Sequence, residues 1–253
     1  MSEYYNAKRT RNLYDPKSSS PFKLSRTKVE LFVNCPRCFY IDRRLGTGRP
    51  PGYPFALNSA VDTLLKKEFD SYREKQKPHP LITKNGIDAI PFKHEKMEEW
   101  RDSLHKGIQF HDKKTNLIIT GGVDDIWITP SDELIIVDYK ATSKKEAVSL
   151  DADWQLSYKR QMDLYGWLFL QNGFKIYPKG YFVYCNGKAD KQKFDQKLEF
   201  DISVLPYEIN YSWVEPAIRN AHKCLESDKI PDVTNDCDYC QYINAINETD
   251  NEK

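Results

Sequence analysis

The chain has 253 residues, of which 40% are hydrophobic and 30% charged, so it can bury a real core and is not wholly disordered. Its longest apolar runs, such as residues 134–137, are far too short to cross a bilayer, and the polar, basic residues 1–11 do not resemble a secretory signal. We therefore expect an intracellular protein of a reducing compartment, cytoplasmic or nucleoid-associated, with no membrane partner.

Charge is unevenly distributed along the chain. The net charge is only +1, but residues 1–50 carry eleven Lys and Arg against four Asp and Glu, and the remainder carries 27 against 33. A basic end can lie along a phosphate backbone. On charge alone, a solvated tail and loop explains the pattern equally well.

The first half of the chain predicts an arm followed by helices. Residues 1–22, rich in Ser, Lys, Arg and Pro, predict a flexible basic arm, and Ser25 can cap a helix that runs to about Asn34. The Gly- and Pro-rich residues 46–54 predict a linker. Apolar residues at helical spacing predict a helix over 56–75 and another around 94–110.

The second half adds strands. Residues 117–140 are rich in Ile and Val and alternate, which predicts two antiparallel strands broken by a turn at 130–133. The elements expected after them are a helix over 154–171, strands over 179–185 and 197–203, and a helix over 212–226. This order predicts an α/β fold, with a short central mixed sheet flanked by helices and a helical extension.

A carboxylate and a lysine end the most hydrophobic strand. Because side chains alternate along a strand, Asp138 and Lys140 share a face with Leu134 and Ile136. Buried charge is costly unless it is paired or binds a metal ion. An acid of the preceding strand near Asp138 would be repelled unless a cation lay between them, and hard divalent ions prefer such oxygen ligands. Alone, the pattern is a weak motif, because an ordinary ion pair on a surface hairpin gives it too.

The partner of Asp138 depends on the hairpin register. A symmetric turn over 130–133 would set Asp125 opposite Asp138, whereas a bulge or a three-residue loop would set Asp124 there. Lys140, beside these acids, could orient the attacking water or stabilise charge on a phosphate. Both registers remain open from these residues alone.

Several motifs occur together in one order. They are Gly121-Gly122-Val123-Asp124, Ile136-Val137-Asp138-Tyr139-Lys140, Gln161-Met162-Asp163-Leu164-Tyr165, the opening LSRTKVELFVNCPRCFYIDRRLG and the closing KIPDVTNDCDYCQY. Over about residues 24–242 this order resembles the RecB-like branch of the PD-(D/E)XK nucleases. That branch includes CRISPR-associated adaptation nucleases and the nuclease domains of recombination helicases. The resemblance implies a restriction-endonuclease-like core, and we expect one nuclease domain over 23–243 with a disordered tail over 244–253.

The resemblance also implies roles for individual residues. Asp124, Asp138 and the Tyr139 carbonyl would hold Mg²⁺ or Mn²⁺, and Lys140 would be the catalytic lysine, with Asp125 as the reserve for Asp124. Gln161 and Tyr165, four residues apart on one helical face, would position DNA or the active site. Read without the family, those two are ordinary residues of an amphipathic helix.

One position departs from the family pattern. The family usually places a histidine on the early helix as a further metal ligand, and here Asp62 takes that place. Aspartate is a competent ligand for Mg²⁺ or Mn²⁺. The five histidines do not fill the position and are expected to be surface or partly packed residues.

Four of the six cysteines form two C-x-x-C pairs, Cys35 with Cys38 and Cys237 with Cys240. In a reducing compartment this spacing indicates metal ligation, and two pairs can close a four-thiolate shell that joins the chain ends around zinc or an iron–sulfur cluster. RecB-like nucleases commonly use one N-terminal and three C-terminal cysteines for a cluster, a pattern this chain rearranges. We expect a 4Fe-4S cluster, alternatively Zn²⁺, and simple buried thiols at Cys185 and Cys224.

Together these features predict a metal-dependent deoxyribonuclease. Its expected substrates are single strands or duplex ends, and its expected setting is DNA repair, recombination, phage replication or CRISPR adaptation, with a helicase or a recombination or adaptation protein as partner. A catalytically inactive, metal-stapled DNA-binding or assembly module is the alternative, and a nuclease acting on RNA is a third. Phe39 and Tyr40 could stack bases, although core packing is the simpler use of them.

Overall fold

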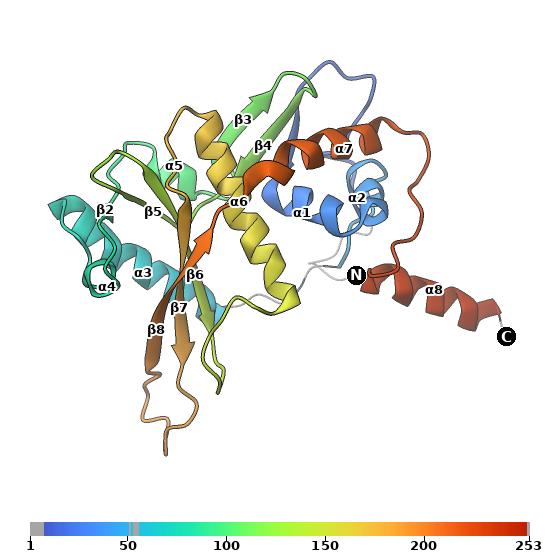
Figure 1. The fold of residues 1–253 in the computed structure, drawn as a ribbon. Coiled ribbons are helices and arrows are strands. Elements are labelled where there is room, and N and C mark those ends of the chain that lie inside the picture. Colours follow the sequence, from blue (N-terminus) through green and yellow to red (C-terminus); the bar gives the residue numbers. More distant parts are fainter. Residues whose placement is uncertain (1–7, 51, 53–55, 252–253) are drawn as a thin grey trace. The chain divides into compact units, whose positions relative to one another are not determined.

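The computed structural model describes residues 8–50, 52 and 56–251 (Figure 1). The chain divides into two compact units. One, the cysteine unit, is formed from residues 1–53, 111–119 and 212–253, and the other, the sheet unit, from residues 54–110 and 120–211. The domain expected over 23–243 therefore spans both units. Within the described residues, no helix combines the length and apolarity needed to span a membrane.

The sheet unit is a five-stranded mixed sheet with helices on both faces. Its strand order is β2-β5-β6-β7-β8, in which β6 and β7 are parallel and the other neighbours antiparallel. The strands are β2 (Ile90–Pro91), β5 (Asp125–Ile128), β6 (Leu134–Thr142), β7 (Lys179–Gly187) and β8 (Phe200–Glu208). The helices are α3 (Ala56–Lys75), α4 (Pro80–Lys84), α5 (Met97–Arg101), the 3₁₀ turn η1 (Asp153–Gln155) and α6 (Leu156–Gln171).

Alternation along β6 directs its two sets of side chains to different helices. Ile135, Val137 and Tyr139 pack in one core with Leu65 and Phe69 of α3. The alternate residues face α6, as the contact between Asp138 and Gln161 shows. Figure 1 shows α6 crossing one face of the sheet while α3 lies behind the other. The candidate site lies on β6, between these two helices.

The cysteine unit contains β1 (Phe22–Ser25), α1 (Arg26–Asn34), α2 (Pro36–Arg43), α7 (Val214–Glu226) and α8 (Asp238–Asn251). Strands β3 (Ile108–Asp112) and β4 (Leu117–Gly121), which form a second sheet in the order β1-β4-β3, and the 3₁₀ turn η2 (Tyr211–Trp213) contribute residues to both units. Phe39 is 0% and Tyr40 3% exposed, so both pack in the core and neither is available to stack a base.

The expected α/β fold is confirmed, including the mixed sheet, the flanking helices and the meeting of the four cysteines. The predicted helix over 56–75 is α3 itself. Residues 117–140 form three strands instead of two, because the chain leaves β4 of the three-stranded sheet at Gly121 and joins the five-stranded sheet at Asp125. The sequence did not predict the short helices α2 and α4 or the C-terminal helix α8.

The predicted helix around 94–110 is wrong. Only Met97–Arg101 is helical, and residues from Ile108 onward form β3. The Asp102 carboxylate accepts hydrogen bonds from the backbone N–H groups of Leu104 and His105, which ends the helix. Gly107 then has a φ of +69°, and its Cα lies so close to the Gly121 carbonyl that a Cβ would be 2.4 Å away.

Two expectations concern the chain ends. Of the expected arm over 1–22, residues 1–7 lie outside the described part, and from Lys8 onward the segment is tied to the cysteine unit. Arg9 N–H donates to the Gly46 carbonyl at 2.9 Å, and Tyr14 N–H to the Arg43 carbonyl at 2.8 Å. The tail expected to be disordered from 244 is helical as far as Asn251, where α8 ends.

Candidate active site and four-cysteine cluster

The hairpin between β5 and β6 sets the register of the candidate site. Asp125 pairs with Val137 and Ile128 with Leu134, so the next position outward places Asp124 opposite Asp138. The Asp124 Oδ2 atom accepts a hydrogen bond of 2.9 Å from the Tyr139 N–H. Asp124 therefore lies against the D-Y-K segment of β6.

The turn explains this register. Thr129 N–H donates to the Glu133 carbonyl at 3.0 Å, which leaves the three residues 130–132 as the loop. Asp132 takes a φ of +62°, the left-handed conformation that such loops require. A three-residue loop, and not the symmetric turn over 130–133, connects the strands.

Asp125 has a different environment from its neighbour. It is 0% exposed and forms an ion pair with Arg73. Its carboxylate also accepts hydrogen bonds from the Tyr139 hydroxyl at 2.7 Å, from Arg101 at 3.2 Å and from the Ile126 N–H at 2.8 Å. These partners pair Asp125 with two guanidinium groups inside the sheet unit, so Asp125 holds the core together.

Asp138 and Lys140 meet on the α6 face of β6. Asp138 is 0% exposed, and its carboxylate accepts a hydrogen bond of 2.6 Å from the Gln161 side chain and forms an ion pair with Lys140. Burial lowers the pKa of Lys140, but the carboxylates of Asp138 and Asp124 outweigh burial and raise the pKa above its ordinary value. Lys140 is thus a protonated donor held beside a buried carboxylate.

Asp62 and Asp124 share an ammonium group. The Lys66 Nζ atom lies 2.8 Å from Asp62 Oδ2 and 3.5 Å from Asp124 Oδ1. Burial raises the pKa of Asp62, and the nearby Asp124 carboxylate raises it further, while Lys66 lowers it. One cation therefore already reaches both carboxylates, and carboxylate oxygens are the ligands that hard divalent ions prefer.

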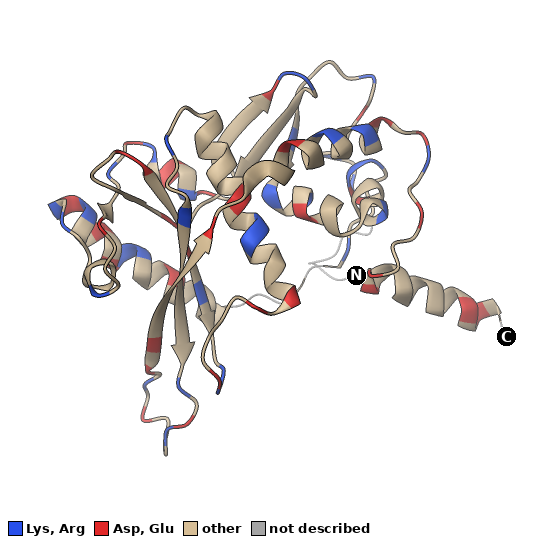
Figure 2. Cartoon of the chain, in the orientation of Figure 1, with Lys and Arg blue, Asp and Glu red and all other residues tan. Residues whose placement is uncertain are grey.

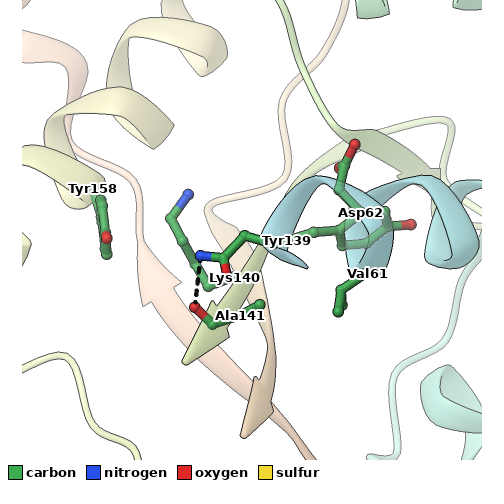
Figure 3. Close-up of a pocket in the computed structure, with 7 residues that line it drawn as sticks. Val61, Asp62, Tyr139, Lys140, Ala141 and Tyr158 are labelled. Atoms are coloured by element: carbon green, nitrogen blue, oxygen red, sulfur yellow. Dashed lines mark hydrogen bonds between the residues drawn. The ribbon is translucent and has the colours of Figure 1, made fainter. Parts of the chain in front are cut away.

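A small pocket is lined by residues of α3, β6 and α6 (Figure 3). Its volume is about 90 Å³, room for several water-sized molecules. It is lined by Asn58, Val61, Asp62, Tyr139, Lys140, Ala141 and Tyr158. The charged groups at this pocket can hold a cation and, with Lys140, an anionic group beside it.

Tyr165 has a packing role next to these residues. It is 3% exposed, and a Cβ on Gly121 would lie 2.6 Å from the edge of its ring. This close approach explains the glycine at Gly121. Tyr165, on α6, is also among the groups that raise the pKa of Lys140.

The structure thus brings together the residues that the sequence singled out on α3, β6 and α6. Sequence reasoning missed Lys66 and Tyr158. The signals were present, because Lys66 follows Asp62 by four residues, and Tyr158 precedes Gln161 by three on the same helical face. Lys140 Nζ lies 4.5 Å from the centre of the Tyr158 ring.

The four paired cysteines meet in the cysteine unit. Cys35 Sγ lies 3.7 Å from Cys240 Sγ, and Cys38 Sγ lies 3.7 Å from Cys237 Sγ and 3.9 Å from Cys240 Sγ. All four sulfur atoms lie within 4.8 Å of one another. The cluster could hold a metal ion.

Local structure prepares these sulfurs for a cation. Cys35 is the N-cap of α2 and Cys237 immediately precedes α8, so each C-x-x-C pair lies at a helix N-terminus, where the helix dipole favours thiolates. Burial raises the pKa of Cys35, but hydrogen bonds led by one from Thr234 outweigh it and lower the pKa to about 6, whereas burial raises the pKa of Cys38 and of Cys240. Arg49 donates to Cys237 Sγ at 3.1 Å.

The two remaining cysteines are ordinary thiols. Cys185 is 3% exposed, and Cys224 is half-buried on α7. Burial raises the pKa of each to about 11. Neither belongs to the four-cysteine cluster.

The chain matches the family model of the PD-(D/E)XK nuclease superfamily over residues 56–245. Since this match covers more than half of the chain, the protein belongs to that superfamily, whose members are generally nucleases that use divalent metal ions. No curated protein matches it. The crystal structure of SSO0001 aligns with 90% of this chain and 85% of its own at 16% identity and a TM-score of 0.40, a likeness too distant to support a functional argument.

Proposed function

We propose that this protein is a Mg²⁺- or Mn²⁺-dependent deoxyribonuclease of the RecB-like branch. The proposal rests on one observation. Asp124 accepts a hydrogen bond from the Tyr139 N–H, in the same D-Y-K segment whose Asp138 forms an ion pair with Lys140. The order of the motifs and the cysteine pairs at both ends support the branch. On this proposal one nuclease domain extends over 23–243, since the family match crosses both units.

Asp62, Asp124, Asp138 and the Tyr139 carbonyl would hold the metal ion. When bound, the ion would lower the pKa of a water molecule and neutralise phosphate charge. Gln161 fixes the Asp138 carboxylate through its 2.6 Å hydrogen bond. Lys140, kept protonated by the neighbouring carboxylates, donates to the phosphate or orients the attacking water.

The test is cleavage of labelled single-stranded, duplex and matched RNA substrates with Mg²⁺ or Mn²⁺. Asp138→Asn and Lys140→Ala are each expected to lower the rate on DNA about 100-fold or more, because each removes charge from the reacting centre. Asp88→Asn, at an exposed acid of the same unit, is the matched control and should cleave normally.

Each of the other possible results would favour a different function or a different catalytic centre. Binding of DNA by the unsubstituted protein without cleavage would mean an inactive, metal-stapled DNA-binding or assembly module. Cleavage restricted to RNA would mean a ribonuclease. Retention of activity in Asp138→Asn and Lys140→Ala would place the catalytic centre elsewhere.

We further propose that the cysteine cluster holds one Zn²⁺ ion in preference to the 4Fe-4S cluster. A tetrahedron with zinc–sulfur bonds of about 2.3 Å has sulfurs about 3.8 Å apart, close to the 3.7–3.9 Å that separates three of the sulfur pairs, and all four sulfurs lie within 4.8 Å of one another. Four thiolates that each bind a different iron of a cluster must stand wider apart. Protein purified without oxygen should be colourless and contain one zinc per chain, whereas a brown chromophore with iron and sulfide would mean the cluster.

The cellular setting belongs to the same proposal. The cysteine cluster requires reduced thiols, which supports a cytoplasmic or nucleoid-associated protein. A helicase motor or a recombination or adaptation protein is the partner that this proposal implies. DNA repair, recombination, phage replication and CRISPR adaptation are the settings that fit a RecB-like nuclease.

A further inference from the structure

An exposed tryptophan lies next to the candidate active site. Trp154, in η1, is 54% exposed, whereas tryptophan is usually among the most buried residues. Its ring meets Tyr158 edge-on, with centroids 5.4 Å apart and planes at 85°. Tyr158 lines the pocket and lies beneath the Lys140 ammonium (Figure 3). Tyr158 therefore contacts Lys140, and Trp154 contacts Tyr158 and is exposed to solvent.

The backbone that carries Trp154 is firmly held. Gln155 is 1% exposed, and its side chain donates to the Ser149 carbonyl at 2.6 Å and to the Tyr184 hydroxyl at 3.1 Å. The same side chain accepts a hydrogen bond from the Ala152 N–H at 3.0 Å. Burying the polar residue and exposing the apolar one is the reverse of the usual pattern. It fixes Trp154 with its ring toward solvent.

A lysine accompanies each ring. Lys144 Nζ lies 5.0 Å from the centre of the Trp154 ring, as Lys140 Nζ lies 4.5 Å from that of Tyr158. The Lys144 backbone is held by Asn186 of β7 through two hydrogen bonds of 2.8 and 3.0 Å. Lys159 and Arg160 add positive charge on the N-terminal half of α6 (Figure 2). In the sequence between Lys144 and Arg160 the acids are Glu146, Asp151 and Asp153.

We propose that the exposed Trp154 ring, supported edge-on by Tyr158, is a stacking platform for a base of single-stranded DNA, next to the phosphodiester that is cut. The inference rests on the proposed nuclease function and adds to it the residues that would hold an unpaired base. Aromatic faces bind bases without sequence preference, and cations beside them hold the phosphates. The faces of bases inside a duplex are already stacked on their neighbours, so this platform fits an unpaired strand or a frayed end.

The first test measures binding of fluorescent single-stranded oligonucleotides in buffer without added Mg²⁺ or Mn²⁺, where metal-dependent cleavage is not supported and the cysteine cluster keeps its metal ion. Trp154→Ala is expected to weaken binding about 5- to 100-fold, the range for loss of one stacked base. Trp154→Phe should bind within about threefold of the unsubstituted protein. Phe194→Ala is the matched control, because Phe194 is 74% exposed in the β7–β8 connection and is not part of the pocket; it should bind normally.

The second test changes the DNA instead of the protein and compares the unsubstituted protein with Trp154→Ala. A single abasic nucleotide is moved along the oligonucleotide, and binding should weaken when the gap reaches the platform. Trp154→Ala should be insensitive to the gap at that position. The inference is overturned if Trp154→Ala binds like the control, if no abasic position matters, or if the unsubstituted protein does not bind single strands.

Cleavage assays separate this inference from the proposed function. With Mg²⁺ or Mn²⁺, Trp154→Ala should raise KM on single-stranded DNA and leave kcat within about threefold, because the platform holds substrate without touching the reacting atoms. Absence of cleavage together with Trp154-dependent binding refutes the nuclease and keeps the platform. Normal kcat and KM in Trp154→Ala refute the platform and keep the nuclease.

Discussion

Asp124 and Asp125 are adjacent residues with opposite surroundings. Asp124 is partly exposed beside Asp62 and Lys66, whereas Asp125 is fully buried between Arg73 and Arg101. Asp124→Asn is expected to abolish metal-dependent cleavage with little change in stability. Asp125→Asn is expected to lower the free energy of unfolding by about 3 kcal/mol, because it leaves buried guanidinium groups without their shared carboxylate.

Urea unfolding and cleavage assays on the same two proteins check this assignment. The two substitutions are matched controls for each other, since both remove one carboxylate charge at neighbouring positions. A stable, inactive Asp125→Asn beside a destabilised, active Asp124→Asn would reverse the roles of the two acids.

Lys66 places a positive charge where two carboxylates could hold a metal ion. A divalent ion that binds Asp62 and Asp124 must displace or rearrange the ammonium group, which lies 2.8 and 3.5 Å from them. Lys66→Met is therefore expected to lower several-fold the Mg²⁺ concentration that gives half-maximal cleavage. Titration of Mg²⁺ checks this, with the exposed neighbour Lys67→Met as the control. A higher Mg²⁺ requirement in Lys66→Met would show that Lys66 assists the metal site.

At the scale of elements, the β5–β6 turn determines which acid reaches the site. Asp132 adopts a φ of +62°, which costs an L-residue about 1 kcal/mol and glycine almost nothing. Asp132→Gly is therefore expected to raise the melting temperature by a few degrees and leave cleavage unchanged. Asp132→Ala is the comparison, because alanine also removes the carboxylate but, unlike glycine, still bears the cost of a positive φ. A large loss of activity in Asp132→Gly would mean that the register tolerates less change than we expect.

The same turn shows what the sequence could and could not predict. Alternation along β6 was enough to place Asp138 and Lys140 on one face, because the period of a strand is fixed. Alternation could not decide between Asp124 and Asp125 as the partner of Asp138, because that choice depends on whether residue 132 enters the left-handed region. A one-residue change in the loop exchanges the two acids.

Local interactions also decided whether other predictions were right or wrong. The pattern over 94–110 has helical spacing, but the Asp102 side chain competes for the backbone N–H groups that would continue the helix. Helix α3 was predicted to the residue, because its apolar positions pack on Tyr139 and its neighbours. Trp154 gave no sequence signal, since its exposure follows from the burial of Gln155.

At the scale of the whole molecule, the four cysteines join segments near the two ends of the chain. A metal ion bound to their thiolates would contribute its binding free energy to folding, as structural zinc generally does. Strong chelators are therefore expected to accelerate amide hydrogen exchange in α1, α2 and α8 more than in β6 and β7. Mass spectrometry of the exchanged protein measures this. Equal acceleration in both units, or none, would contradict a structural metal in the cysteine unit.

The central claim is that Asp124 and Asp138 bind one divalent ion beside Lys140. Anomalous diffraction from crystals grown with Mn²⁺ tests it most directly. We predict one ion within about 2.2 Å of an oxygen of each carboxylate, with Lys140 next to it, and its loss in Asp138→Asn. An ion bound by neither carboxylate, or by one alone with the other turned away, would contradict this claim.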